Sequence, residues 1–81
     1  MDLKQLMVFV KVANSLNFTK AADELYMTQS SVSKVIKSFE DELGTQLLNR
    51  YPKTELTEIG IRVYKLAFNR LSLFSKNYRG I

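Results

Sequence analysis

The chain has 81 residues, of which 46% are hydrophobic and 25% are charged, with a formal net charge of +4. A chain of this length forms one small domain of marginal stability, so a partner surface that extends its core is expected. The sequence contains no cysteine and no histidine. Disulfides, conventional zinc or haem sites and the Ser-His and Cys-His nucleophile pairs are therefore excluded, and we expect no enzyme, metal or cofactor.

No apolar run approaches the roughly 18 residues that a membrane span needs, and Lys11 interrupts the apolar stretch near the N-terminus where a secretory signal would lie. We therefore expect a cytoplasmic protein. The charge is segregated, because residues 25–39 carry two lysines and no acid, whereas residues 40–42 are all acidic. A basic region beside an acidic end fits a surface that meets a polyanion, although a solvated surface with random charge placement remains the alternative.

Two helices are predicted in the first third of the chain. The first runs from about Leu3 to Leu16, with Asp2 as its N-cap. Its apolar residues recur at three- and four-residue spacing, at Leu3, Leu6, Met7, Val10 and Ala13. The second helix is short, from Lys20 to about Tyr26, with Thr19 as its N-cap. Two alanines within it, at 21 and 22, allow another helix to approach closely.

The third predicted helix begins after Thr28, its expected N-cap, and stops at Gly44. Its apolar face consists of Val32, Val35, Ile36, Phe39 and Leu43. At about 100° per residue, the opposite face consists of Ser30, Ser33, Lys34, Lys37 and Ser38. The exposed face is therefore made of hydroxyls and lysines in its first half and becomes acidic only near its end.

A short hairpin and a long helix complete the chain. Residues 47–49 and 55–56 are predicted as strands joined by a turn over residues 51–54, and they are too short to be stable without the helices. Thr57 is expected to cap a final helix that runs from Glu58 to at least Tyr78. Gly60 in its first turn indicates close backbone packing.

The apolar arc of this last helix is wider than one small domain can cover. One stripe has coiled-coil spacing and consists of Tyr64, Ala67, Leu71, Phe74, Tyr78 and Ile81. A second stripe consists of Ile59, Val63, Leu66 and Leu73. We expect one stripe to pack on its own domain and the other on a second copy, and we assign dimerisation to Tyr64, Ala67, Leu71, Phe74 and Tyr78. A central helix buried within a larger protein is the alternative.

The order of these elements predicts a mainly α winged helix-turn-helix over residues 1–57, with a three-helix core and a two-stranded wing, followed by a linker and dimerisation helix over residues 58–81. In that architecture the third helix enters the major groove of DNA. Gln29, Ser30, Ser31 and Ser33 are small or polar enough to meet base edges, and Gln pairs with adenine. The cations expected to hold phosphates are Lys34 and Lys37, with Lys53 in the wing.

Each of these residues also has a simpler interpretation. Serine and glutamine are common early in helices, two lysines one turn apart are usually solvated, and Arg50 could pair with a nearby acid. The combination on one exposed face is what favours DNA binding.

Five segments resemble the N-terminal DNA-binding domain of LysR-type transcriptional regulators. They are FTKAADEL at 18–25, TQSSVS at 28–33, FEDELG at 39–44, LLNR at 47–50 and LTEIG at 56–60. The resemblance implies a bacterial regulator that binds duplex DNA as a homodimer through its long helix. It also implies that the larger effector-binding domain is absent from these 81 residues. A small-molecule effector would bind only that missing domain, and tetramers would form only in a full-length regulator.

The resemblance places base and groove contacts at Gln29, Ser30, Ser31, Ser33 and Lys34. It places backbone contacts at Thr19, Thr28, Lys37 and Lys53, and we expect Lys20 and Arg50 to add backbone or wing contacts. The sequence departs from the family pattern in three ways. Ser30 stands where proline is common, Lys34 and Lys53 stand where arginine is usual, and the wing is one residue shorter and lacks its glycine. Lysine cannot make the forked guanine contact of arginine.

The favoured function is sequence-specific binding of duplex DNA by a homodimer that reads a pseudo-palindromic site to regulate transcription. A non-specific nucleoid or RNA-binding module is a related alternative, but it would not need the hydroxyls at the start of the third helix. A helical dimerisation or protein-interaction module without DNA contact is the alternative from a different class, because the stripe of the last helix alone would satisfy it.

Overall fold

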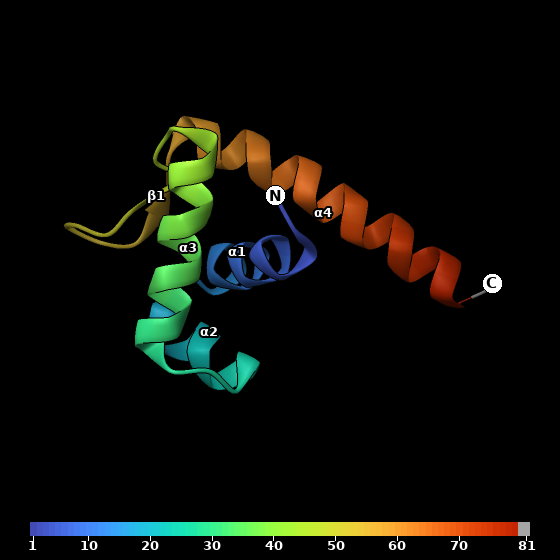
Figure 1. The fold of residues 1–81 in the computed structure, drawn as a ribbon, viewed down its shortest axis with the longest axis horizontal. Coiled ribbons are helices and arrows are strands. Elements are labelled where there is room, and N and C mark those ends of the chain that lie inside the picture. The colour runs from blue at the N-terminus through green and yellow to red at the C-terminus, as the bar shows by residue number, and fades with distance from the viewer. Residues whose placement is uncertain (80–81) are drawn as a thin grey trace.

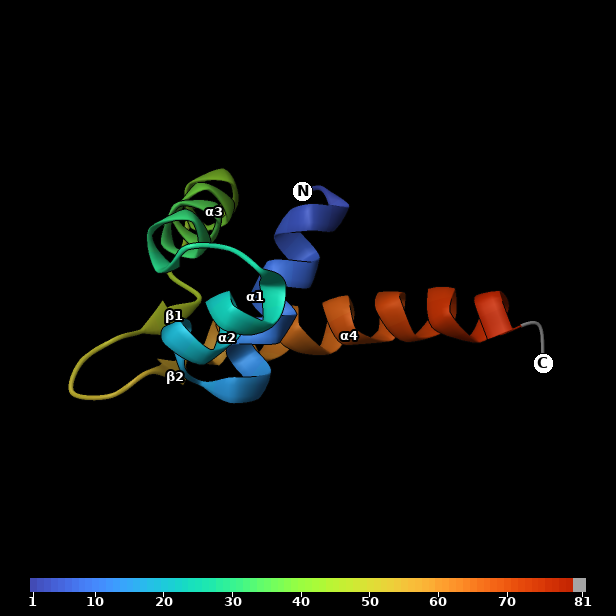
Figure 2. The same ribbon diagram turned by 90° about the horizontal axis from the view of Figure 1, so that it is seen from below.

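The computed structural model describes the backbone of residues 1–79 and the side chains of residues 1–71. The elements in chain order are α1 (Leu3–Ser15), α2 (Phe18–Leu25), α3 (Gln29–Leu43), β1 (Leu48–Asn49), β2 (Glu55–Leu56) and α4 (Glu58–Arg79). Helices α1, α2 and α3 pack together, the strands project beside α3, and α4 packs on α1 and extends beyond the body of the molecule (Figure 1). The wing and the far end of α4 therefore lie at opposite ends (Figure 2). The predicted winged helix-turn-helix is confirmed.

The hydrophobic core surrounds α1, which contacts each of the other helices. The largest fully buried side chains are Phe9, Phe39, Ile36, Leu47, Val12 and Val32. The rings of Phe9 and Phe39 join α1 to α3 edge to face, with centroids 5.8 Å apart. Leu3 and Met7 were expected in the apolar stripe of α1, but they are 52% and 48% exposed. The buried face of α1 instead includes Val8 and Val12, because α2, α3 and α4 all pack against this helix.

Capping side chains set the boundaries of α1 and α3 as expected. Asp2 forms a capping box with Gln5, in which each side chain accepts a hydrogen bond from the backbone amide of the other. Thr28 Oγ1 accepts from the Ser31 amide at 3.0 Å and begins α3. Gly44 ends α3 in the left-handed conformation, with φ 72°.

The N-cap of α2 is Asn17, and the assignment of this role to Thr19 was wrong. Asn17 Oδ1 accepts from the Lys20 amide at 2.9 Å, so α2 begins at Phe18 and Thr19 lies in its first turn. Asparagine is a strong N-cap residue. The earlier start also places the Phe18 ring in the core, where it is 8% exposed.

The wing is a two-stranded antiparallel ribbon that begins one residue later than expected, at Leu48. Its register pairs Leu48 with Leu56 and Asn49 with Glu55. The carboxylate of Glu40 on α3 accepts hydrogen bonds from the amides of Leu47 and Leu48, at 2.8 and 3.2 Å. Two strands this short are not stable alone, so this carboxylate fixes the wing to α3.

The start of α4 packs tightly against the chain before β1. Thr57 Oγ1 accepts from the Gly60 amide at 2.9 Å and donates to the Gln46 carbonyl at 2.8 Å, which confirms Thr57 as the cap. A Cβ atom on Gly60 would lie 2.1 Å from the carbonyl oxygen of Leu47. The predicted close backbone packing at Gly60 is therefore confirmed.

The stripe of α4 assigned to a second copy packs on its own chain over its described part. Ala67 is 1% exposed and belongs to the core, and Tyr64 and Leu71 are half-buried against that core. Tyr64 Oη also donates to Asn14 Oδ1 of α1 at 2.5 Å. Burial in its own domain leaves little of Ala67 for a second copy, whereas the assignment of the half-buried Tyr64 and Leu71 to a dimer interface stays a prediction.

Other apolar residues of α4 remain uncovered. Leu66 is 72% exposed, Phe68 47% and Ile61 44%. The remaining two residues of the assigned stripe, Phe74 and Tyr78, lie outside the described side chains.

Candidate nucleic-acid interface

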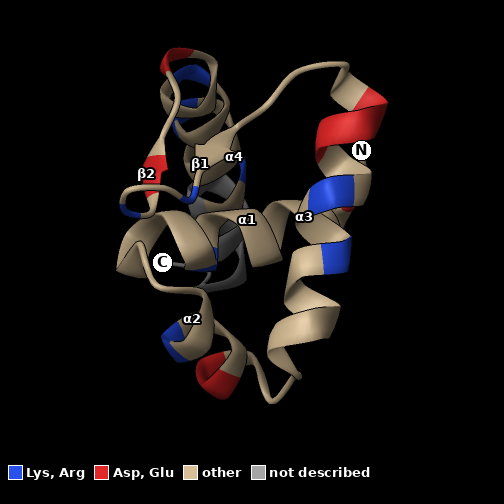
Figure 3. Cartoon of the chain, turned by 90° about the vertical axis from the view of Figure 1, so that its left-hand side faces the viewer, with Lys and Arg blue, Asp and Glu red and all other residues tan. Residues whose placement is uncertain are grey.

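The N-terminal half of α3 presents a polar and basic face to solvent. Its exposed side chains are Gln29, Ser30, Ser31, Lys34 and Lys37, and Ser33 is half-buried beside them. Figure 3 shows the basic positions of α3 separated from the acidic positions at its C-terminal end. The predicted division of this face into a basic and hydroxyl-rich half and an acidic end is confirmed.

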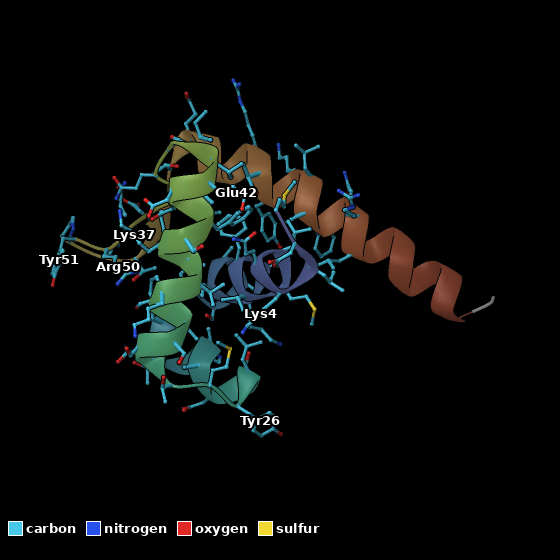
Figure 4. The ribbon with its side chains drawn as sticks, viewed as in Figure 1. Lys4, Tyr26, Lys37, Glu42, Arg50 and Tyr51 are labelled. Carbon is cyan, nitrogen blue, oxygen red and sulfur yellow. The ribbon has the colours of Figure 1, made fainter. Side chains whose placement is uncertain are left out.

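An open groove runs between α3 and the wing. Its lining includes Ser30, Ser33, Lys34, Lys37, Arg50 and Tyr51. Figure 4 shows Lys37, Arg50 and Tyr51 on the same side of the molecule. Residues that are distant in the sequence, from α3 and from the wing, thus share one surface.

Arg50 joins the wing to the helix pair. Its guanidinium carbon lies 4.2 Å from the ring centroid of Phe18, a cation–π contact, and its Nη1 donates to Ser33 Oγ at 3.3 Å. Among the described side chains Arg50 forms no salt bridge, so the interpretation that it pairs with an acid was wrong. Guanidinium has five donors. The N–H donors of Arg50 that do not bond to Ser33 can bond to another acceptor in the groove.

Lys37 forms a salt bridge with Asp41 one turn later, with Nζ 3.1 Å from Oδ1. The two side chains are 72% and 64% exposed. Exposed pairs of this spacing contribute only about 0.3–0.5 kcal/mol, so Lys37 can exchange Asp41 for a phosphate at little cost.

Several polar side chains at the start of α3 bond to one another. Gln29 Nε2 donates to Thr19 Oγ1 at 2.8 Å, and Thr28 Oγ1 donates to Ser31 Oγ at 2.8 Å. Thr19, Gln29, Ser30, Ser33 and Arg50 line a second hollow between α2, α3 and the wing. The fold therefore brings together residues that the sequence assigned separately to base and backbone contacts.

The predicted contacts Lys20 and Lys53, like Thr28 and Ser31, line neither the groove nor this hollow. Lys20 is exposed in the first turn of α2, and Lys53 is exposed in the turn between the strands, near Tyr51, which is 89% exposed. Neither residue has a described hydrogen bond that fixes its side chain.

Sequence reasoning missed two residues that shape the interface, Phe18 as the platform under Arg50 and Glu40 as the anchor of the wing. From the sequence, Phe18 is placed only within the segment 18–25, and Glu40 only among the three acids at 40–42. No local pattern identifies either role, because each partner lies in another element of the fold.

Within residues 1–71, no three acidic, histidine or cysteine side chains come together as metal ligands would. Of the helices in the described part, none combines the length and the apolar character that crossing a membrane requires.

The fold and this surface define the DNA-binding domain of a transcriptional regulator. A family model described as "Bacterial regulatory helix-turn-helix protein, lysR family" matches residues 3–61. The chain therefore belongs to the LysR family.

Relatives and solved structures agree with this assignment. The chain is 40% identical over 83 residues to the HTH-type transcriptional regulator CatR of Pseudomonas putida, covering 100% of this chain and 29% of CatR. It is 43% identical over 74 residues to the HTH-type transcriptional regulator BudR of Raoultella terrigena, covering 90% of this chain and 26% of BudR. The chain thus spans less than a third of the length of these relatives.

Two solved structures are complexes with DNA. The BenM_DBD/catB site 1 DNA complex matches with a TM-score of 0.92 and 38% identity, covering 98% of this chain and 89% of that one. The CbnR_DBD–DNA complex matches with a TM-score of 0.87 and 30% identity, covering 98% of this chain and 92% of that one.

Proposed function

We propose that the chain binds specific sequences in duplex DNA as a homodimer that reads a pseudo-palindromic site, and that it thereby regulates transcription. The observation that carries the proposal is the groove in which the polar start of α3 and Arg50 of the wing face the same space. Helix α3 would enter the major groove, where Gln29, Ser30 and Ser33 would meet base edges. A regulator of this kind would be found in the cytoplasm at the nucleoid, because the chromosomal DNA lies there.

Phosphate contacts would hold the helix in register. Lys34 and Lys37 lie one turn apart on the exposed face of α3, and Lys53 lies in the wing turn. Thr28 caps α3 and Lys20 is exposed in the first turn of α2, so we assign both of them supporting contacts to the DNA backbone, and Ser31 stays among the residues assigned to the groove. The solved DNA complexes of BenM_DBD and CbnR_DBD support this placement by analogy, because their chains share the fold.

Reversing both α3 charges tests the proposal. The variant Lys34→Glu with Lys37→Glu is expected to lose at least about 100-fold in DNA affinity and to lower the salt slope by about 2, since each phosphate contact contributes about 0.9. Arg62→Glu with Lys65→Glu on the exposed part of α4 changes the net charge equally and is the matched control. Unchanged DNA affinity in the first variant would contradict the proposal.

The dimer is proposed to form through the apolar side chains of α4 that its own domain leaves uncovered. Leu66 is the most exposed of these among the described residues of α4. Phe74 and Tyr78 remain predicted members of the same interface. Leu66→Glu is expected to shift the sedimentation coefficient toward a monomer, whereas Asn69→Glu on the polar face leaves it unchanged. If the Leu66→Glu variant remains a dimer, the uncovered apolar face of α4 is not the dimer interface.

The module that dimerises without touching DNA is the second candidate. It would use the same exposed apolar residues of α4, but it gives no reason for the hydroxyl and lysine face of α3. Selection from a pool of random duplexes separates the two functions, because only a specific DNA binder enriches a consensus, and a homodimer enriches a two-fold symmetric one.

A further inference from the structure

We propose that Thr19 is a positioning residue for sequence readout, which holds the Gln29 side chain so that this chain prefers adenine over guanine at one base pair of each half-site. The inference rests on the proposed function. It replaces the expectation that Thr19 contacts the DNA backbone.

The hydrogen bond between the two side chains carries the argument. Gln29 Nε2 donates to Thr19 Oγ1 at 2.8 Å, from the first residue of α3 to the first turn of α2. The two residues are ten positions apart, so the packing of α2 on α3 sets their distance. Ala21 and Ala22 of α2 are 0% and 3% exposed in the core, and their small side chains allow close helix packing there.

A glutamine side chain is long and flexible, and ordering it on binding costs about 1.5–2 kcal/mol. A bond already present in the free protein removes part of that cost, which is the general advantage of preorganisation. Both residues are exposed and line the hollow beside Ser30 and Arg50, so the amide is held where DNA would approach.

The direction of the bond determines which base edge the amide matches. A glutamine amide has two N–H donors and one carbonyl acceptor. With one N–H directed to Thr19, the second N–H and Oε1 remain free. Adenine offers an N6–H donor and an N7 acceptor in the major groove, which match this pair, whereas guanine offers two acceptors. Oε1 opposite guanine O6 would be unpaired, and that arrangement is disfavoured.

The test compares selections from a pool of random duplexes. The Gln29→Ala variant identifies the base pair that Gln29 reads, as the position where preference is lost. The Thr19→Val variant keeps the shape and the β-branch but removes the hydroxyl. It is expected to reduce the adenine-to-guanine preference at that pair by about two- to tenfold, equivalent to one ordinary hydrogen bond, and to leave other positions unchanged. The Thr19→Ser variant keeps the hydroxyl and is expected to retain the preference.

A double variant separates positioning from a direct phosphate contact. In the Gln29→Ala background, Thr19→Val is expected to have no further effect on binding. A uniform loss of affinity for all sequences that persists in this background would overturn the inference and would restore Thr19 as a backbone contact. An unchanged adenine preference in Thr19→Val would also overturn it. If the unaltered protein enriches no sequence at all, the proposed function fails and this inference fails with it.

Discussion

Replacing Gly60 by alanine tests whether the joint between α4 and the wing is as tight as its geometry indicates. A Cβ atom at this position would lie 2.1 Å from the Leu47 carbonyl oxygen and 3.2 Å from Thr57 Oγ1. Opening the first distance from 2.1 to 3.0 Å, below which real Cβ atoms are essentially never found, requires a shift of about 0.9 Å. The obstructing atom is backbone and also accepts from the Thr57 amide at 3.0 Å, so it cannot move freely.

The expected magnitude is the balance of two opposing effects. In an unobstructed helix, Gly→Ala stabilises by about 1 kcal/mol. Overpacking costs about 1–3 kcal/mol, and each hydrogen bond that the shift strains, at Leu47 and at Thr57, costs about 1 kcal/mol more. We expect Gly60→Ala to lower the free energy of unfolding by about 2–4 kcal/mol. That is a large share of the about 4–12 kcal/mol typical of a domain of this length.

The assay is urea unfolding followed by far-ultraviolet circular dichroism at one fixed protein concentration, because dimerisation would make stability depend on concentration. Thermal unfolding should show a decrease in Tm of about 10–25 °C. Asn69→Ala at an exposed position of α4 is the control and is expected to change stability by only a few tenths of a kcal/mol. A Gly60→Ala variant as stable as the unaltered protein would refute the reasoning.

Three further changes test other contacts. Glu40→Ala leaves the amides of Leu47 and Leu48 without their acceptor, and urea unfolding is expected to show a loss of about 1–3 kcal/mol. Asn17→Ala removes the cap of α2 and is expected to lower the free energy of unfolding by about 1 kcal/mol in the same assay. Unchanged stability would contradict the assignment of Asn17 as the N-cap. Asp41→Asn removes a negative charge and a weak salt bridge from the α3 face. It is expected to raise DNA affinity at low salt while changing stability by less than about 0.5 kcal/mol, and weaker DNA binding would contradict the proposed interface.

The local chemistry of the sequence predicted the helix boundaries at Asp2, Thr28, Gly44 and Thr57. Each of these caps bonds within a few residues of itself, so the pattern that identifies it is contiguous. The hydroxyl and lysine face of α3 was also predictable, because helical periodicity alone assigns residues to opposite faces.

The tertiary structure alone decided which apolar residues of α4 pack inward, namely Tyr64, Ala67 and Leu71 of one stripe and Val63 of the other. Both stripes are apolar with helical spacing, and the coiled-coil spacing of one of them did not settle which one its own domain covers. The choice depends on contacts such as that of Tyr64 with Asn14, which are 50 residues apart in the chain. Burial of Ala67 against α1 then left Leu66 uncovered.

The same reason explains the details of the candidate interface. The sequence supplied the residue types for DNA recognition, from Gln29 to Lys37, and placed them on one exposed helix face. Only the packing of α2 and the wing against α3 determined that Thr19 bonds Gln29 and that Arg50 lies between Phe18 and Ser33. Hydrogen bonds and ring contacts between elements depend on distances that the fold sets, and such distances leave no periodic signal in a single sequence.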